Sequence, residues 1–69
     1  MKILKSVYLE NTGNGHLKFW RGILLADNTV ICEWGKIGYE PQSKSFPGVG
    51  AAFLEKKINE KLKKGYQYV

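Results

Sequence analysis

Residues 32–42, CEWGKIGYEPQ, place a tryptophan beside a lysine that is held between two glycines. Glycine lets a backbone approach a ligand closely, so Lys36 can reach a backbone phosphate. The indole of Trp34 offers a flat face for stacking on a base or a sugar. The alternative is that Trp34 anchors the core at the end of a strand, and composition alone favours this, because tryptophans are highly buried on average. Both interpretations stay open at this point.

Two known nucleotide-binding loops can be excluded around Lys36. A phosphate-binding P-loop needs an earlier glycine and a Ser or Thr after the lysine, but Val30 and Ile37 stand at those places. The four residues 35–38 match the GxxG loop of KH domains. That loop joins two helices, whereas a strand is expected before Gly35 and Pro41 disfavours an immediate helix.

The sequence predicts no enzyme, no cofactor and no metal site. The acidic residues are scattered, and Glu33 and Cys32 would point to opposite faces of a strand. A nucleophilic cysteine needs a base and an electropositive setting; we expect Cys32 to be buried, without a cationic neighbour, and slow to react. His16 is expected to be a solvated loop residue. One cysteine and one histidine are too few for a zinc site.

Length and charge narrow the class of protein. The 69 residues predict one domain over 1–69. The single cysteine fits a reducing compartment, no apolar run reaches the about 18 residues of a membrane span, and Lys5 interrupts any signal peptide. We therefore expect a soluble, cytoplasmic protein without a membrane partner. A net charge of +5 favours anionic partners such as nucleic acid.

Alternating apolar residues predict strands at 2–10, 16–26 and 29–34, with turns at 11–15 and 27–28. A short fourth strand is expected at 42–46, and residues 66–69 alternate like another. A helix is expected at 49–64, ended by Gly65. The predicted class is α+β: a small antiparallel sheet of four to five strands with one C-terminal helix packed across it.

The helix is expected to bury one apolar stripe. The spacing of Ala51, Leu54, Ile58 and Leu62 places them on one side. We expect Leu54, Ile58 and Leu62 to face Phe19, Ile23 and other residues of the sheet. The polar residues off the stripe are expected to face water: Lys56, Lys57, Glu60, Lys63 and Lys64.

In this order and spacing, the segments resemble a WGR domain, the module named for a Trp-Gly-Arg signature. It is found in the DNA-dependent poly(ADP-ribose) polymerases and in bacterial proteins. Residues 18–20, KFW, resemble the Lys-Phe-Tyr of its second strand, and residues 34–38, WGKIG, stand where Trp-Gly-Arg-Val-Gly belongs, with Gln42 at the expected distance. Lys61 with Gly65 and Tyr66 resembles its closing pattern. Lys36 replaces the signature arginine and so loses its planar fork, and Pro41 replaces a glycine.

The resemblance implies a function without chemistry. In the polymerases the tryptophan packs on the sugar of the terminal nucleotide at a DNA break, and basic groups beside it hold phosphate. The expected nucleic-acid-binding residues here are Trp34, Lys36, Lys18, Gln42, Lys44 and Tyr66. We expect a monomer that binds DNA or RNA, at DNA ends or where duplex meets single strand. The alternative is a protein-interaction or regulatory subunit that docks on a larger enzyme through the same surface.

Overall fold

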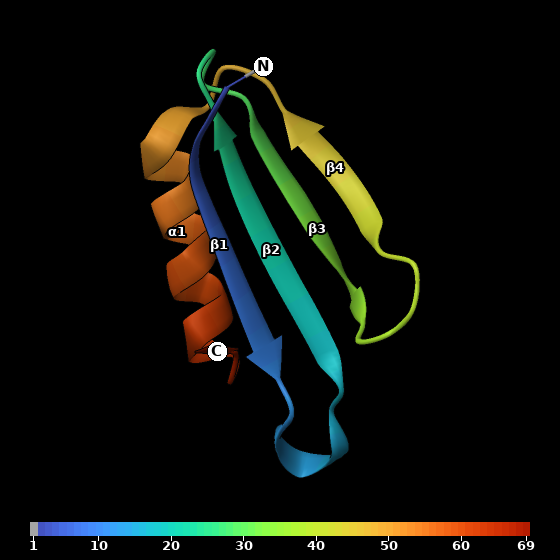
Figure 1. Cartoon of the computed structure of the whole chain (residues 1–69). Helices are drawn as coiled ribbons and strands as arrows, with labels where there is room; N and C mark the ends of the chain where they lie inside the picture. Colours follow the sequence, from blue (N-terminus) through green and yellow to red (C-terminus); the bar gives the residue numbers. More distant parts are fainter. Residues whose placement is uncertain (1) are drawn as a thin grey trace.

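The computed structural model describes residues 2–69, which form a five-stranded antiparallel sheet with one helix against it (Figure 1). The elements in chain order are β1 (Ile3–Asn11), the 3-10 turn η1 (Gly13–Gly15), β2 (Lys18–Leu25), β3 (Val30–Lys36), β4 (Gln42–Phe46), α1 (Gly50–Lys63) and β5 (Gln67–Tyr68). Their spatial order in the sheet is β4-β3-β2-β1-β5. The expected class is confirmed, although β3 continues to Lys36 instead of ending at Trp34.

Side chains on one face of the sheet form the core with α1. Successive residues of a strand point to opposite faces, and the pairing of Leu9 with Trp20 and of Trp20 with Trp34 sets which residues share a face. The buried cluster consists of Val7, Leu9, Trp20, Leu24, Val30, Cys32, Leu54, Ile58 and Tyr66. Packing of these apolar groups is the main source of stability in so small a chain.

The expectation that the helix faces Phe19 and Ile23 is wrong. Both residues have the opposite parity to Trp20, and Phe19 instead stacks on Tyr8 on the other face, with ring centroids 5.8 Å apart. Both faces of β2 carry apolar residues, so the sequence of β2 alone does not show which face the helix covers. The register of β1 and β2 determines it, because Leu9 pairs with Trp20 and the apolar residues of β1 therefore lie on the same face as Trp20.

The helix stripe is only partly as expected. Leu54 and Ile58 are buried, whereas Leu62 is 38% exposed and Ala51 is exposed. The helix packs tightly on the sheet at Gly22, where an added Cβ would lie 2.5 Å from Leu54 Cδ1. After Ile58, Lys61 of the helix and Tyr66, which follows the helix, lie toward the sheet, and Leu62 faces solvent.

A tight cap ends the helix and places Tyr66. The Gly65 N–H donates to the Leu62 carbonyl at 3.2 Å, and the Tyr66 N–H donates to the Lys61 carbonyl at 3.1 Å. This is the Schellman pattern, which needs a left-handed residue, and Gly65 supplies it with φ 100°. The expected cap at Gly65 is confirmed, and its consequence is that the Tyr66 ring enters the core beside α1.

Candidate functional site

A groove of about 450 Å³ lies where β2 begins and β3 ends, and we call it the strand-end groove. It is lined by Gly15, His16, Leu17, Lys18, Trp34, Gly35, Lys36 and Tyr66. The structure therefore brings together four of the expected site residues, namely Lys18, Trp34, Lys36 and Tyr66. The lining contains no acidic residue, so its charged groups favour an anion.

The β2–β3 ladder explains this grouping. Lys18 pairs with Lys36 and Trp20 pairs with Trp34, so all four side chains lie on the helix side of the sheet. The Ile37 N–H donates to the Leu17 carbonyl at 2.9 Å and ties the loop after β3 to the start of β2. The strand pairing thus places Lys18 and Lys36 next to each other in the lining of the groove.

The loop after β3 turns sharply beside the groove. The Tyr39 N–H donates to the Lys36 carbonyl at 3.0 Å, and Gly38 has φ 89°, a conformation that side chains disfavour. The Nζ of Lys36 lies 4.9 Å from the centroid of the Tyr39 ring, which is within the range of a cation–π contact. Lys36 is exposed, so its ammonium group can also meet a ligand.

Trp34 lies between the core and the groove. It is half-buried and packs against the core cluster, and it also lines the strand-end groove. Trp20, which pairs with it across the ladder, is the core tryptophan and is 2% exposed.

Tyr66 closes the groove and is shared by two lysines. The Nζ atoms of Lys18 and Lys61 each lie 5.7 Å from the centroid of its ring. Burial raises the pKa of the Tyr66 hydroxyl above its ordinary value of 10.0, so at neutral pH the hydroxyl is protonated and able to donate a hydrogen bond. The ring therefore connects the strand-end groove to the C-terminal turn of α1.

Gln42 and Lys44 lie farther out on the same face, on the edge strand β4. They pair with Trp34 and Cys32 respectively, and both are exposed. Neither lines the strand-end groove, and Lys44 Nζ lies 5.3 Å from the centroid of the Phe46 ring. The structure thus places these two expected site residues next to the groove along the sheet, outside its wall.

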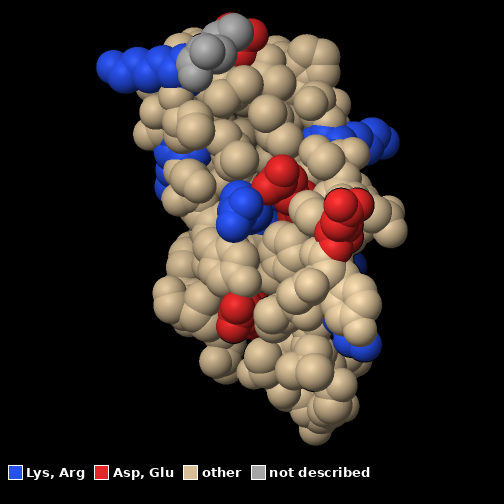
Figure 2. Space-filling model, turned by 45° about the vertical axis from the view of Figure 1, so that its right-hand side comes forward, with Lys and Arg blue, Asp and Glu red and all other residues tan. Residues whose placement is uncertain are grey.

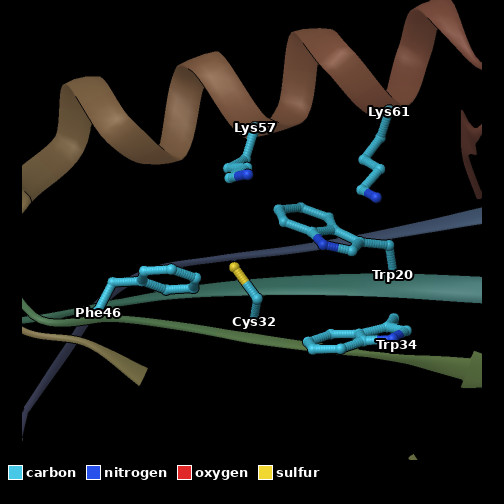
Figure 3. Close-up of a pocket in the computed structure, with 6 residues that line it drawn as sticks. All are labelled: Trp20, Cys32, Trp34, Phe46, Lys57 and Lys61. Carbon is cyan, nitrogen blue, oxygen red and sulfur yellow. The ribbon is translucent and has the colours of Figure 1, made fainter. Parts of the chain in front are cut away.

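A second, smaller groove of about 180 Å³ lies between α1 and the β3–β4 half of the sheet. We call it the helix groove; it is lined by Trp20, Cys32, Trp34, Phe46, Lys57 and Lys61. Figure 3 shows Lys57 and Lys61 extending from α1 toward the sheet, and the Cys32 thiol pointing toward the helix. Trp34 is the residue common to the two grooves.

The sequence analysis missed the roles of Lys57 and Lys61. Lys57 was expected to face water, but both lysines are half-buried and line the helix groove. Long lysine stems cover apolar surface while the charged ends reach toward water. The signal was the spacing of Phe53, Lys57 and Lys61, four residues apart, which forms a second stripe beside Leu54 and Ile58.

Cys32 is buried, as expected, but it does have cationic neighbours. Burial raises the pKa of its thiol above the ordinary value of 9.0, and the charges of Lys57 and Lys61 act in the opposite direction more weakly. The expected absence of a cationic neighbour was wrong, because the second stripe of α1 turns both lysines toward the sheet. Since burial dominates, the thiol stays protonated at neutral pH.

Lys61 has an unfavourable setting for its charge. Burial lowers its pKa below the ordinary 10.5, and the charges of Lys64 and Lys57 lower it further. Desolvation and like charges both disfavour the ammonium form. A bound anion would offset the repulsion from Lys57 and Lys64, so an anionic ligand would stabilise the ammonium form of Lys61.

The acidic groups that form ion pairs lie outside both grooves. Arg21 and Glu33 form an ion pair at 3.0 Å on the face away from the helix, and Glu60 lies 3.7 Å from Lys57. Figure 2, which turns the β4 side of the molecule forward, shows one basic and one acidic group side by side near the centre of this face, with other charged groups apart from them. Within residues 2–69, no ion pair involves Lys18 or Lys36.

The described residues contain neither a group of three or more metal-ligating side chains nor a helix long and apolar enough to cross a membrane. Fold and grooves together define a small binding module whose grooves combine lysines with aromatic rings. The chain belongs to the WGR domain family, whose model matches residues 5–69, as the resemblance implied. WGR domains are nucleic-acid-binding modules rather than catalytic domains. No curated protein and no solved structure matches the chain.

Proposed function

We propose that this protein binds nucleic acid through the strand-end groove, at DNA ends or where duplex meets single strand, without chemistry of its own. One observation carries the proposal: Lys18, Lys36, Trp34 and Tyr66 line a single groove that contains no acidic side chain. Cationic groups beside aromatic rings are the combination with which proteins hold a nucleic-acid backbone and stack on its bases or sugars.

The two lysines supply most of the affinity. Lys18 and Lys36 stand opposite each other on neighbouring strands, so their ammonium groups can contact phosphates on either side of a nucleotide. Each contact with a phosphate releases condensed counterions, which makes the affinity fall as the salt concentration rises. As Lys36 replaces an arginine of the family signature, it acts as a point charge rather than a planar fork.

Trp34 supplies the preference for an end. Its side chain is half-buried against the core cluster. It can therefore contact only a sugar or base at the end of a duplex, where no further base pair covers it. Stacking of a base on an aromatic ring contributes about 1–3 kcal/mol. Gln42 and Lys44 continue the same face along β4 and would contact the strand beyond the terminal nucleotide.

Titration of fluorescently labelled nucleic acids tests the proposal. Fluorescence anisotropy should show tighter binding to a blunt duplex and to a nicked duplex than to a closed circular duplex of the same sequence. RNA duplexes and single strands in the same series show which nucleic acid is preferred. If none of these binds, the groove is not a nucleic-acid site, and the alternative of docking on a protein partner takes its place.

A further inference from the structure

The helix groove has the chemistry of a site for a planar anionic ligand. Three aromatic rings, those of Trp20, Trp34 and Phe46, and the thiol of Cys32 form its apolar surface. The charged groups in its lining are two lysines from α1, and no acidic side chain lines it. A small anion would contact the lysines but not the rings, and an apolar side chain of a peptide would contact the rings but not the lysines. A nucleotide can contact both the rings and the lysines.

The size of the groove limits what can enter. Its volume is about 180 Å³, below the roughly 300–1,000 Å³ of ordinary small-molecule sites. An apolar cavity of about 150 Å³ holds one benzene ring. The helix groove is therefore comparable in size to a single planar base of a nucleic acid.

The position of the groove connects it to the strand-end groove. Trp34 lines both grooves, and the Tyr66 ring contacts Lys18 in one and Lys61 in the other. A strand that lies along Lys18 and Lys36 can therefore pass Trp34 and continue toward α1. Lys61 would hold its phosphate there, and the added negative charge would relieve the repulsion that Lys61 feels from Lys57 and Lys64.

We propose that the helix groove takes one unpaired base of the strand bound in the strand-end groove, with the phosphate of that nucleotide held by Lys61. This rests on the proposed function. It adds a substrate class: duplex ends, gaps or junctions at which a base is unpaired next to the last base pair.

Matched duplexes test this inference in the intact protein. The probes are a blunt duplex and the same duplex with a single terminal overhanging thymidine, adenosine or abasic residue. By anisotropy, the thymidine and adenosine duplexes should each bind roughly 5- to 150-fold more tightly than the abasic one, which is the range expected for one stacked base. Equal affinity for all three overhangs would overturn the inference.

Variants separate this inference from the proposed function. Lys61→Met should remove most of the thymidine preference, whereas Lys63→Met, on an exposed residue of the same helix, should retain it. Cys32→Leu would fill the groove without changing charge, and should abolish the preference while blunt-duplex affinity is retained. If Cys32→Leu does not fold, Cys32→Met, whose flexible side chain also extends into the groove, should reduce the preference; an unchanged preference would contradict the inference.

The Trp20 indole gives a second, independent readout, because Trp20 lines the helix groove and not the strand-end groove. In ¹H–¹⁵N NMR spectra at saturation, the thymidine duplex should shift the Trp20 indole signal more than the blunt duplex does. Equal shifts would show that no base enters the groove, and the inference would fail while binding in the strand-end groove stands. If no duplex binds at all, the inference and the proposed function fail together.

Discussion

Trp20 and Trp34 pair directly across β2 and β3 on the same face of the sheet, yet Trp20 is 2% exposed and Trp34 is only half-buried. The cause is the position of α1, which packs more closely on β2 than on β3. One tryptophan therefore completes the core, and its neighbour keeps a ring surface at the junction of two basic grooves.

The two tryptophans should respond differently to truncation. Trp34→Ala should weaken binding to a blunt duplex by about 1–3 kcal/mol, through loss of stacking, and should leave the protein folded. Trp20→Ala should lower the free energy of unfolding by about 3–5 kcal/mol, as expected for a large core side chain. Anisotropy and urea unfolding measure the two effects. If Trp34→Ala unfolds the protein while substitution of the groove lysines leaves DNA affinity unchanged, Trp34 serves the core alone.

The lysines of the strand-end groove should be visible in the salt dependence of binding. Lys18→Ala and Lys36→Ala should each reduce the slope of log affinity against log salt by about 0.9 on duplex DNA, since each removes one phosphate contact. Lys36→Arg should keep or improve affinity, because a guanidinium contacts phosphate at two points. Lys56→Ala, an exposed lysine of α1 that lines neither groove, is the control. Slopes that do not differ from that control would rule out these contacts.

Gly22 should be required for the seating of the helix. An added Cβ would lie 2.5 Å from Leu54 Cδ1 and 2.5 Å from an atom of the Trp20 ring, so Gly22→Ala should cost about 1–3 kcal/mol of stability through overpacking. Gly13→Ala is a suitable control, because nothing lies within 4 Å of its added Cβ. Thermal or urea unfolding measures both. Equal stability of the two variants would mean that the helix does not rest on Gly22.

Much of the fold follows from local signals in the sequence. Turn residues and alternating apolar positions predicted the strands, and Gly65 predicted the end of the helix. Which face the helix covers did not follow, since both parities of β2 are apolar and only the pairing of Leu9 with Trp20 decides between them. Lys57 and Lys61 were missed for a different reason: their spacing with Phe53 forms a second stripe of the helix, and this stripe turns both lysines toward the sheet.

The expected site residues divide according to their place in the ladder. Lys18 and Lys36 pair with each other beside Trp34 and so share one groove. Gln42 lies opposite Trp34 on an edge strand, where it is exposed and outside the groove wall. The sequence pattern identified these residues as candidates, but the pairing of the strands determines which of them line the same groove and can contact one ligand.

The setting of Lys61 predicts a pH dependence. Burial is the main reason that its pKa is lower in the folded protein than the ordinary 10.5, so the unfolded chain binds this proton more tightly. Between the folded pKa and 10.5, stability should therefore rise with pH. The unfolding free energy of the wild type should increase relative to that of Lys61→Met as the pH is raised through this range. A difference that is constant or falls with pH would contradict the buried placement of Lys61.

The indole N–H groups of the two tryptophans offer the sharpest test that nucleic acid binds at Trp34. In two-dimensional ¹H–¹⁵N NMR spectra each indole gives its own signal, and a blunt DNA duplex can be titrated into the labelled protein. We predict that the Trp34 indole and the backbone amides of Lys18 and Lys36 shift progressively until saturation, while the Trp20 indole changes little. Shifts confined to the opposite face, around Arg21 and Glu33, or no shift at Trp34 on saturation, would contradict the proposed site.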